Sequence, residues 1–150
     1  MRLQVDGAHV QIDPDPEDTL VDVLRDELGS TAVRVGCRNG DCGTCTALVD
    51  GQCVKTCLVL AGRAEGARVE TLASLGTETN PHPVQEAFLA EYAFQCGFCL
   101  PGMILSAVTL LADTPSPSDA EIRNALSGNL CRCTGYVNAV RAVRRAAAAR

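Results

Sequence analysis

Eight of the nine cysteines in this chain fall into two sets of four whose spacings suit metal binding. The first set stands in a glycine-rich stretch and ends with a more distant cysteine; its members are Cys37, Cys42, Cys45 and Cys57. The second set is made of two short pairs that lie far apart in the chain; its members are Cys96, Cys99, Cys131 and Cys133. Thiolates at ligand spacings bind iron–sulfur clusters or zinc, so each set is a candidate metal site.

The first set has the spacing of a plant-type [2Fe–2S] site, in which the run C-x4-C-x2-C is followed by a distant fourth cysteine. The segment Cys37–Cys45 matches that run, and Cys57 supplies the fourth thiolate. Three glycines within Gly36–Gly43 let the loop curl around a cluster and leave backbone N–H groups free to point at its sulfur atoms. A zinc site normally uses two tight cysteine knuckles, whereas one half of this set is a single cysteine. The first set therefore favours a cluster over zinc.

The second set is less specific when it is considered alone. Cys96 and Cys99 form a Cys-x2-Cys pair, and Cys131 and Cys133 form a Cys-x-Cys pair. Such pairs hold zinc as well as iron–sulfur clusters, and the positive charge of Arg132 between two thiolates suits either metal. Zinc is therefore an alternative for this set, and a second cluster is favoured only because the first set stands in the same chain.

Composition and charge narrow the class of function. The formal net charge is −5 with thiols counted as neutral, and the chain has no basic patch of the kind that binds nucleic acid. The N-terminal residues lack the apolar core of a signal peptide, and no stretch approaches the length of a membrane span. We therefore expect a cytoplasmic protein without a membrane span, in which cysteines at ligand spacings serve metals rather than disulfides.

The first part of the chain, residues 1–76, is predicted to form a small mixed sheet that holds one helix. Asp-Gly pairs at positions 6–7 and 50–51 are turn signals for two hairpins. Thr19 and Asp22 resemble a capping box that starts an amphipathic helix, and Gly29 can end it. The expected strands are Leu3–Val5, His9–Ile12, Thr46–Val49, Gln52–Cys57 and Ala67–Leu72, and the expected helix runs from Leu20 to Gly29.

The ninth cysteine, Cys53, is not expected to be a ligand. A two-residue turn at positions 50–51 places Leu48 opposite Cys53 and Thr44 opposite Cys57. Cys57 then lies beside Cys45, whereas Cys53 lies further along the strand, roughly 13 Å away at about 3.3 Å per residue. We expect Cys53 to be a small, partly buried packing residue.

The rest of the chain is predicted to be a linker, residues 77–83, followed by an all-α domain of four helices, residues 84–150. The helices are expected to begin near Val84, to include Met103–Leu111, to follow a capping box at Ser118–Glu121, and to include Val137–Val143. Each cysteine pair of the second set falls in a turn between two helices, so the two turns must come together to close one site. The predicted fold class is α+β.

Four segments of this chain resemble the small iron–sulfur subunit of molybdenum hydroxylases, the family that includes xanthine dehydrogenase, aldehyde oxidoreductase and carbon monoxide dehydrogenase. The matching segments are Gly36–Cys45, Val49-Asp50-Gly51 leading to Cys57, Gln95-Cys96-Gly97-Phe98-Cys99, and Gly128–Tyr136. The resemblance extends over nearly the whole chain and rests on these segments. The resemblance implies a β-grasp ferredoxin-like domain followed by a four-helix [2Fe–2S]-binding domain, with two [2Fe–2S] clusters in all.

The resemblance also implies an electron-transfer subunit of an oxidoreductase, with no substrate chemistry on this chain. Electrons would pass from a molybdopterin cofactor on a large subunit, through the two clusters, to FAD on a medium subunit, in a heterotrimer or a dimer of heterotrimers. Gln95 and Cys133 would lie against the pterin. The chain departs from the family at Arg38-Asn39, where Gly-Glu is usual, and at Leu100, where Thr is usual. A stand-alone iron–sulfur sensor or a metal-stapled interaction module is the alternative interpretation.

Overall fold

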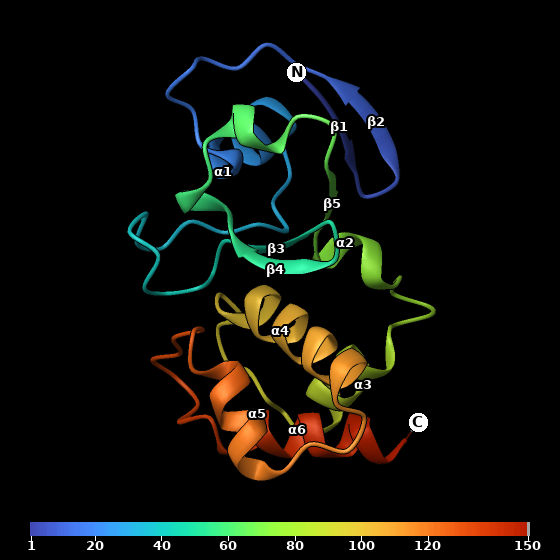
Figure 1. Cartoon of the computed structure of the whole chain (residues 1–150). Helices are drawn as coiled ribbons and strands as arrows, with labels where there is room; N and C mark the ends of the chain where they lie inside the picture. The colour runs from blue at the N-terminus through green and yellow to red at the C-terminus, as the bar shows by residue number, and fades with distance from the viewer. Residues whose placement is uncertain (150) are drawn as a thin grey trace.

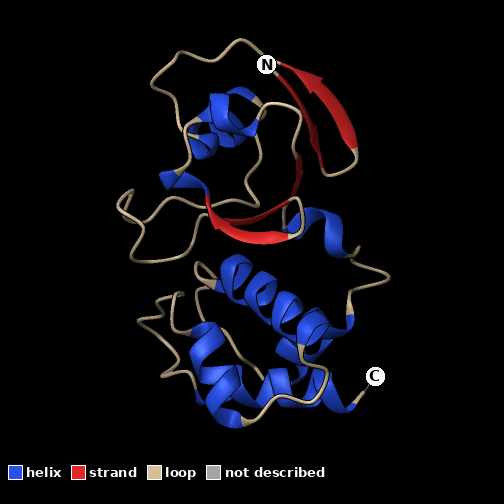
Figure 2. Cartoon of the chain, viewed as in Figure 1, coloured by secondary structure: helices blue, strands red, loops and turns tan. Residues whose placement is uncertain are grey.

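The computed structural model describes residues 1–149, and Arg150 lies outside them. A small sheet with short helical turns forms the first half of the chain, and longer helices form the second half (Figure 1). Colouring by secondary structure shows that the strands are confined to the first half (Figure 2). The predicted α+β class, with a β-grasp sheet followed by a helical part, is confirmed.

The sheet contains five strands in the spatial order β2-β1-β5-β3-β4. The strands are β1 (Arg2–Val5), β2 (Ala8–Gln11), β3 (Thr46–Val49), β4 (Gln52–Lys55) and β5 (Arg68–Glu70). β1 and β5 run parallel, and the other neighbouring pairs run antiparallel. Both hairpins turn at an Asp-Gly pair whose two residues have positive φ, which matches the twist of the flanking strands. The two predicted hairpins are therefore confirmed.

The second hairpin has the predicted register near its turn but a shorter ladder. Leu48 pairs with Cys53, as expected, and the last paired residues are Thr46 and Lys55. The expected strand was longer and reached Cys57. A short 3-10 turn replaces its last residues.

β4 ends at Lys55 because the next residue, Thr56, begins the 3-10 turn Thr56–Leu58. The hydroxyl and the N–H of Thr56 both donate to the Cys45 carbonyl, at 2.7 and 3.4 Å. The chain then turns inward, so Cys57 is only 7% exposed. The predicted ladder pairing of Thr44 with Cys57 is wrong, because the ladder has ended, yet Cys57 still contacts Cys45 as expected.

The helix of the sheet half is less regular than predicted. It begins as one α-helical turn, α1 (Leu20–Asp22), and continues as a π-helical segment, Val23–Glu27. Gly29, at φ +67°, follows it and lets the chain reverse. The helix packs against the sheet through fully buried side chains, namely Leu20, Val21, Val23 and Leu24.

The helical half contains the four predicted helices. They are α3 (Pro83–Ala90), α4 (Leu100–Asp113), α5 (Asp119–Leu126) and α6 (Val137–Ala148). The capping box of α5 forms as predicted, since Ser118 and Glu121 exchange side-chain to backbone hydrogen bonds. The cysteine pairs lie in the α3–α4 and α5–α6 turns. No helix within residues 1–149 is long and apolar enough to cross a membrane.

Helix α4 is the element that joins the two halves. One side of it contacts β3 and β4, and the others contact α3, α5 and α6 (Figure 1). A short helix, α2 (Leu72–Leu75), also packs its Leu72 and Leu75 side chains against the helical core. The predicted limits of domains and linker, at residues 76 and 84, stay predictions.

Candidate metal centres

The first cysteine set forms two close pairs at the edge of the sheet. The N–H of Cys42 donates to Cys37 Sγ at 3.4 Å, and the thiols of Cys45 and Cys57 are in hydrogen-bond contact. Cys45 and Cys57 are buried, at 2% and 7% exposure, whereas Cys37 and Cys42 are half-buried. The structure thus brings all four predicted residues together, with one pair inside the domain and one pair in the loop.

Glycines in this loop occupy places where a side chain would collide. A Cβ on Gly36 would lie 2.9 Å from Cys42 Sγ, and a Cβ on Gly43 would lie 2.2 Å from the Gly128 carbonyl oxygen. Gly43 also has φ +71°, a conformation that favours glycine. The loop can therefore wrap closely around its own thiols and against the helical half at the same time.

Backbone donors and burial act in opposite directions on the thiols of the first set. The N–H groups of Cys42 and Asn39 hydrogen-bond the Cys37 sulfur and lower the pKa of that thiol to about 6. Burial, together with the neighbouring Cys45, raises the pKa of Cys57 to about 11. Donors that stabilise a thiolate also stabilise the negative charge of a cluster, so the backbone N–H groups around Cys37 suit a bound cluster.

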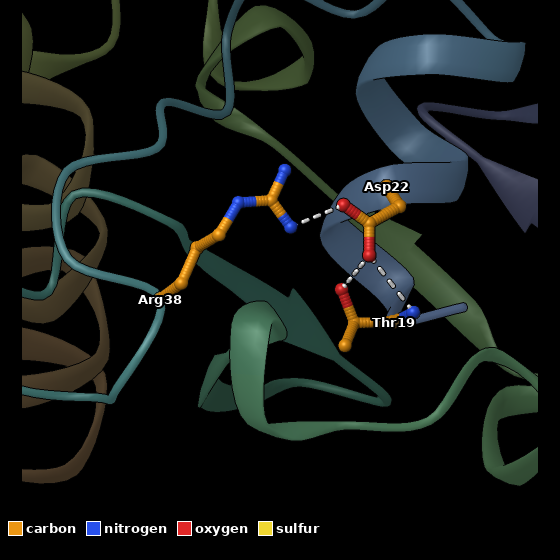
Figure 3. Close-up of polar contacts among 3 residues, drawn as sticks. All are labelled: Thr19, Asp22 and Arg38. Atoms are coloured by element: carbon orange, nitrogen blue, oxygen red, sulfur yellow. Dashed lines mark hydrogen bonds and ion pairs between the residues drawn. The ribbon is translucent and has the colours of Figure 1, made fainter. Parts of the chain in front are cut away.

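An ion pair ties this loop to the start of the helix (Figure 3). Arg38, at φ +59°, places its guanidinium 2.6 Å from Asp22 Oδ1. The other carboxylate oxygen accepts hydrogen bonds from the hydroxyl and from the N–H of Thr19, the latter at 3.0 Å. Burial raises the pKa of Asp22, but Thr19 and Arg38 outweigh it and hold the pKa below its ordinary value of 3.8. The ionised Asp22 therefore serves both the helix cap and the loop.

The second cysteine set also forms two pairs, each made of one residue from either turn. The Sγ atoms of Cys96 and Cys133 lie 3.6 Å apart, and the thiols of Cys99 and Cys131 are in hydrogen-bond contact. Cys96 and Cys133 are exposed, Cys99 is buried, and Cys131 is half-buried. The Gln95 side chain donates to the Cys133 carbonyl at 3.2 Å, so Gln95 lies at the exposed pair.

The pKa values in the second set differ for similar reasons. Burial raises the pKa of Cys99 to about 12. Burial would also raise the pKa of Cys131, but the hydroxyl and N–H of Thr134 outweigh it and lower that pKa to about 7. Thr134 Oγ1 lies 3.2 Å from Cys131 Sγ.

The two sites approach each other where the halves of the molecule meet. The N–H of Leu130, beside the second set, donates to the Cys42 carbonyl of the first set at 2.9 Å. A cavity of about 270 Å³ lies between the loops, and it is lined by Gly36, Cys37, Cys42, Thr44, Cys96, Phe98, Cys99, Leu130, Cys131, Arg132 and Cys133. The cavity therefore touches cysteines of both sets.

Close backbone packing supports that junction. Asn129 is 3% exposed, and its amide nitrogen donates to Ser106 Oγ at 2.7 Å. Its Oδ1 has no hydrogen-bond donor among the described residues. That oxygen faces two glycines, since a Cβ on Gly43 would come within 2.7 Å of it and a Cβ on Gly102 within 2.4 Å. The Cα–H groups of these glycines are the weak donors that remain for it.

The donor sets fit [2Fe–2S] clusters. Each set offers four thiols in two pairs, and a [2Fe–2S] cluster takes two thiolates on each of its two irons. The paired arrangement therefore suits a two-iron cluster better than a mononuclear zinc site.

The structure also corrects and extends the predictions for single residues. Cys53 stands apart from both sets, on β4, but it is exposed rather than partly buried, and its Sγ lies 3.2 Å from Thr109 Oγ1 on α4. Thr44 and Thr134, whose hydroxyls each lie 3.2 Å from a cysteine Sγ, were not predicted. The sequence did offer a sign of these contacts, because Thr44 and Thr134 each lie within three residues of a cysteine of their set.

Arg34 was also not predicted to contact the second site, and nothing in its spacing from the cysteines indicated that contact.

Comparison with known families matches both halves of the chain. A family described as "2Fe-2S iron-sulfur cluster binding domain" matches residues 3–73, and a family described as "[2Fe-2S] binding domain" matches residues 69–144. The sheet half and the helical half therefore each correspond to a separate [2Fe–2S] module.

Individual relatives agree over nearly the full length. The chain is 46% identical to a nicotinate dehydrogenase subunit of Pseudomonas putida, over 99% of this chain and 94% of that one. It is 44% identical to the nicotinate dehydrogenase small FeS subunit of Eubacterium barkeri, over 96% of this chain and 92% of that one.

Solved structures have the same fold. A chain of quinoline 2-oxidoreductase from Pseudomonas putida 86 superposes with a TM-score of 0.93 at 40% identity, covering 99% of this chain and 94% of that one. Aldehyde oxidoreductase from Desulfovibrio desulfuricans superposes with a TM-score of 0.94 at 44% identity, and this chain corresponds to 17% of it.

The fold and the two sites define a protein that carries two [2Fe–2S] clusters for electron transfer. The chain belongs to the family of small iron–sulfur subunits of molybdenum-hydroxylase-type dehydrogenases. It is accordingly a subunit of an oxidoreductase, and its relatives are subunits of multi-subunit complexes.

Proposed function

We propose that each cysteine set holds one [2Fe–2S] cluster and that the chain passes electrons between cofactors on two partner subunits. The first cluster would be held by Cys37, Cys42, Cys45 and Cys57, and the second by Cys96, Cys99, Cys131 and Cys133. When bound, such clusters take up and release one electron each. The observation that carries the proposal is the shared cavity, because it brings two four-thiol sites to one junction.

The residues of the chain would serve this function in different ways at the two sites. In the first site, the N–H of Cys42 on Cys37 Sγ stabilises negative charge, and burial of Cys45 and Cys57 excludes water from the other pair. In the second site, Cys133 is exposed and Gln95 lies beside it. The exposure of the second site supports placing the electron-donating partner there.

We propose a large partner subunit with a molybdopterin-type cofactor and a medium partner subunit with FAD, in a heterotrimer or a dimer of heterotrimers. Gln95 and Cys133 would contact the pterin. The names of the relatives, which include nicotinate dehydrogenase subunits and an aldehyde oxidoreductase iron–sulfur subunit, support this assembly. We propose the cytoplasm as its location.

The first experiment is metal analysis of the purified protein. We expect about four irons and four sulfides per chain, in two clusters with distinct spectra. Two irons per chain, or zinc in the second site, would contradict the two-cluster proposal. Affinity purification from cells that express the neighbouring genes should also yield a large molybdenum protein and a flavoprotein, and recovery of the chain alone would argue against the assembly.

A second experiment tests the role of Gln95 in the assembled complex. Gln95→Ala should slow reduction of the clusters by substrate while iron and sulfide content stay unchanged, because the substitution removes a side chain at the exposed pair and no thiolate. The complex should be assayed with nicotinate, quinoline and aldehydes, which the names of the relatives mention. Loss of iron in this variant would assign Gln95 to the fold instead.

A further inference from the structure

The two cysteine loops are joined by a side-chain contact in addition to their backbone hydrogen bond. We propose that Arg34 is a positioning residue that holds the Cys96–Cys99 turn against the first cysteine loop and so sets the gap between the two clusters. The inference rests on the proposed function, because it concerns electron transfer between the two sites. It assigns Arg34 and its contact with Phe98 a role that the ligand spacing does not indicate.

The backbone of Arg34 is anchored to the first loop. Its N–H donates to the Thr44 carbonyl at 3.2 Å, and its own carbonyl accepts from the Thr44 hydroxyl at 3.1 Å. Thr44 lies between Cys42 and Cys45, so these two bonds join the segment before the loop to the segment inside it. These two bonds therefore tie the Arg34 backbone to the cysteine loop.

The side chain of Arg34 reaches the other half of the molecule. Its Nη1 donates to the Gly97 carbonyl, and the guanidinium carbon lies 5.8 Å from the centroid of the Phe98 ring. Gly97 and Phe98 are the two residues between Cys96 and Cys99. Arg34 thus contacts the second cysteine turn through one hydrogen bond and one cation–π contact.

Phe98 makes the reciprocal contact with the first loop. Its Cε1 lies 3.6 Å from the position that a Cβ on Gly36 would occupy, next to Cys37. Phe98 also lines the cavity that cysteines of both sets share. The ring therefore lies close to the first loop, and the Arg34 guanidinium lies over it.

This contact complements the hydrogen bond between Leu130 and Cys42. That bond holds the Cys131–Cys133 turn, whereas the Arg34 contact holds the Cys96–Cys99 turn. Transfer of a single electron between the sites breaks no bond and needs no proton, and its rate falls exponentially with distance. Fixing both turns of the second site against the first loop therefore keeps the transfer distance short and constant.

The test is the magnetic coupling between the two reduced clusters in the full holo-protein, measured by low-temperature electron paramagnetic resonance. Dipolar coupling falls with the cube of distance, so it reports the gap without requiring activity. Arg34→Gln removes the guanidinium and Phe98→Leu removes the ring. Both should weaken the coupling and slow transfer between the clusters severalfold, with iron and sulfide content unchanged. Arg34→Lys, which keeps a charged donor but not the planar group, should give an intermediate coupling.

Arg25 offers a matched control. It lines the same surface cleft as Arg34 and Phe98, but its side chain donates to the Val33 carbonyl, within the first half of the chain. Arg25→Gln should leave the coupling unchanged. Unchanged coupling in both Arg34→Gln and Phe98→Leu would overturn the inference and leave the cluster assignment intact. Loss of iron in both variants would also overturn it, because Arg34 would then support the fold rather than the gap. Wild-type protein lacking one cluster would instead refute the proposed function.

Discussion

The two metal sites each bring four cysteines together, but they take them from different kinds of structural element. Three thiols of the first site come from one loop of consecutive residues, and the fourth comes from a turn beside it, so a single domain builds the site. The second site is assembled from two helix–helix turns, and neither turn holds more than two cysteines. The first site therefore depends on local loop conformation, and the second depends on helix packing.

The sites also differ in what surrounds them. The first site has a buried pair, Cys45 and Cys57, and a half-buried pair. The second has an exposed pair, Cys96 and Cys133, and Gln95 beside it. Both sites use four thiols, so exposure, rather than ligand type, distinguishes them.

The largest expected effect comes from removing a ligand of the local site. Cys57→Ser should abolish or severely deplete the first cluster while the second remains, because no other thiol among the described residues lies beside Cys45 on that side. Iron analysis and circular dichroism in the visible range would follow both clusters. Cys53→Ser is the control on the same segment, and it should leave both spectra intact. Survival of the first cluster in Cys57→Ser, with its loss in Cys53→Ser, would reverse the ligand assignment.

The next effect concerns the packing between the two sites. Gly43→Ala should lower the free energy of unfolding by about 1–3 kcal/mol beyond any cost of its positive φ, because the new Cβ would lie 2.2 Å from the Gly128 carbonyl oxygen. Urea unfolding of the holo-protein measures it. Gly66→Ala is the matched control, since Gly66 has φ +76° and nothing within 4 Å of its Cβ position. Equal losses in the two variants would mean that the interface yields easily and backbone strain alone matters.

A smaller effect should separate the two sites electronically. Thr134→Val removes the hydroxyl next to Cys131 Sγ and should lower the potential of the second cluster by up to roughly 60 mV, a tenfold change in a one-electron equilibrium. Thr44→Val should shift the first cluster less, because the Thr44 hydroxyl proton is donated to the Arg34 carbonyl. Redox titration monitored by electron paramagnetic resonance gives both potentials. A larger shift from Thr44→Val would show that its hydroxyl donates to Cys42 instead.

The smallest effect concerns the ion pair that is specific to the first loop. Asp22→Asn should cost about 1 kcal/mol at neutral pH, because it weakens the helix cap and the contact with Arg38. The folded-state pKa of Asp22 is lowered, so this stabilisation is present at neutral pH and is lost as pH falls below 3.8 through the folded pKa. Thermal unfolding at neutral pH measures the loss.

The control for that pair is Glu70→Gln, which breaks a partly exposed ion pair with Arg68 that caps no helix. It should change the unfolding temperature less than Asp22→Asn does. An equal effect from the two variants would mean that the helix cap contributes nothing beyond a surface ion pair.

Much of the local architecture could be predicted because it depends on short-range chemistry. Asp-Gly turns require positive φ, which produced both hairpins, and the register next to the second turn followed from counting. The start of α5 could be predicted because Ser118 and Glu121, three residues apart, form a capping box. The end of β4 could not be predicted, because the hairpin pattern gives no sign of the 3-10 turn that Thr56–Leu58 form. The π-helical segment Val23–Glu27 was not predicted either, because its apolar spacing also fits an ordinary α-helix.

The sequence by itself determined the grouping of the cysteines, since ligand spacing and loop glycines act within a few residues of one another. Only the tertiary structure decided how the two groups meet. The Leu130 N–H donates to the Cys42 carbonyl, and the Arg34 side chain contacts Gly97 and Phe98. These residues are far apart in the sequence, so no local pattern predicts the contacts. Those contacts require α4 to dock on β3 and β4, and docking depends on the combined shape of two surfaces rather than on any one segment. The gap that electrons cross is therefore a property of the assembled fold.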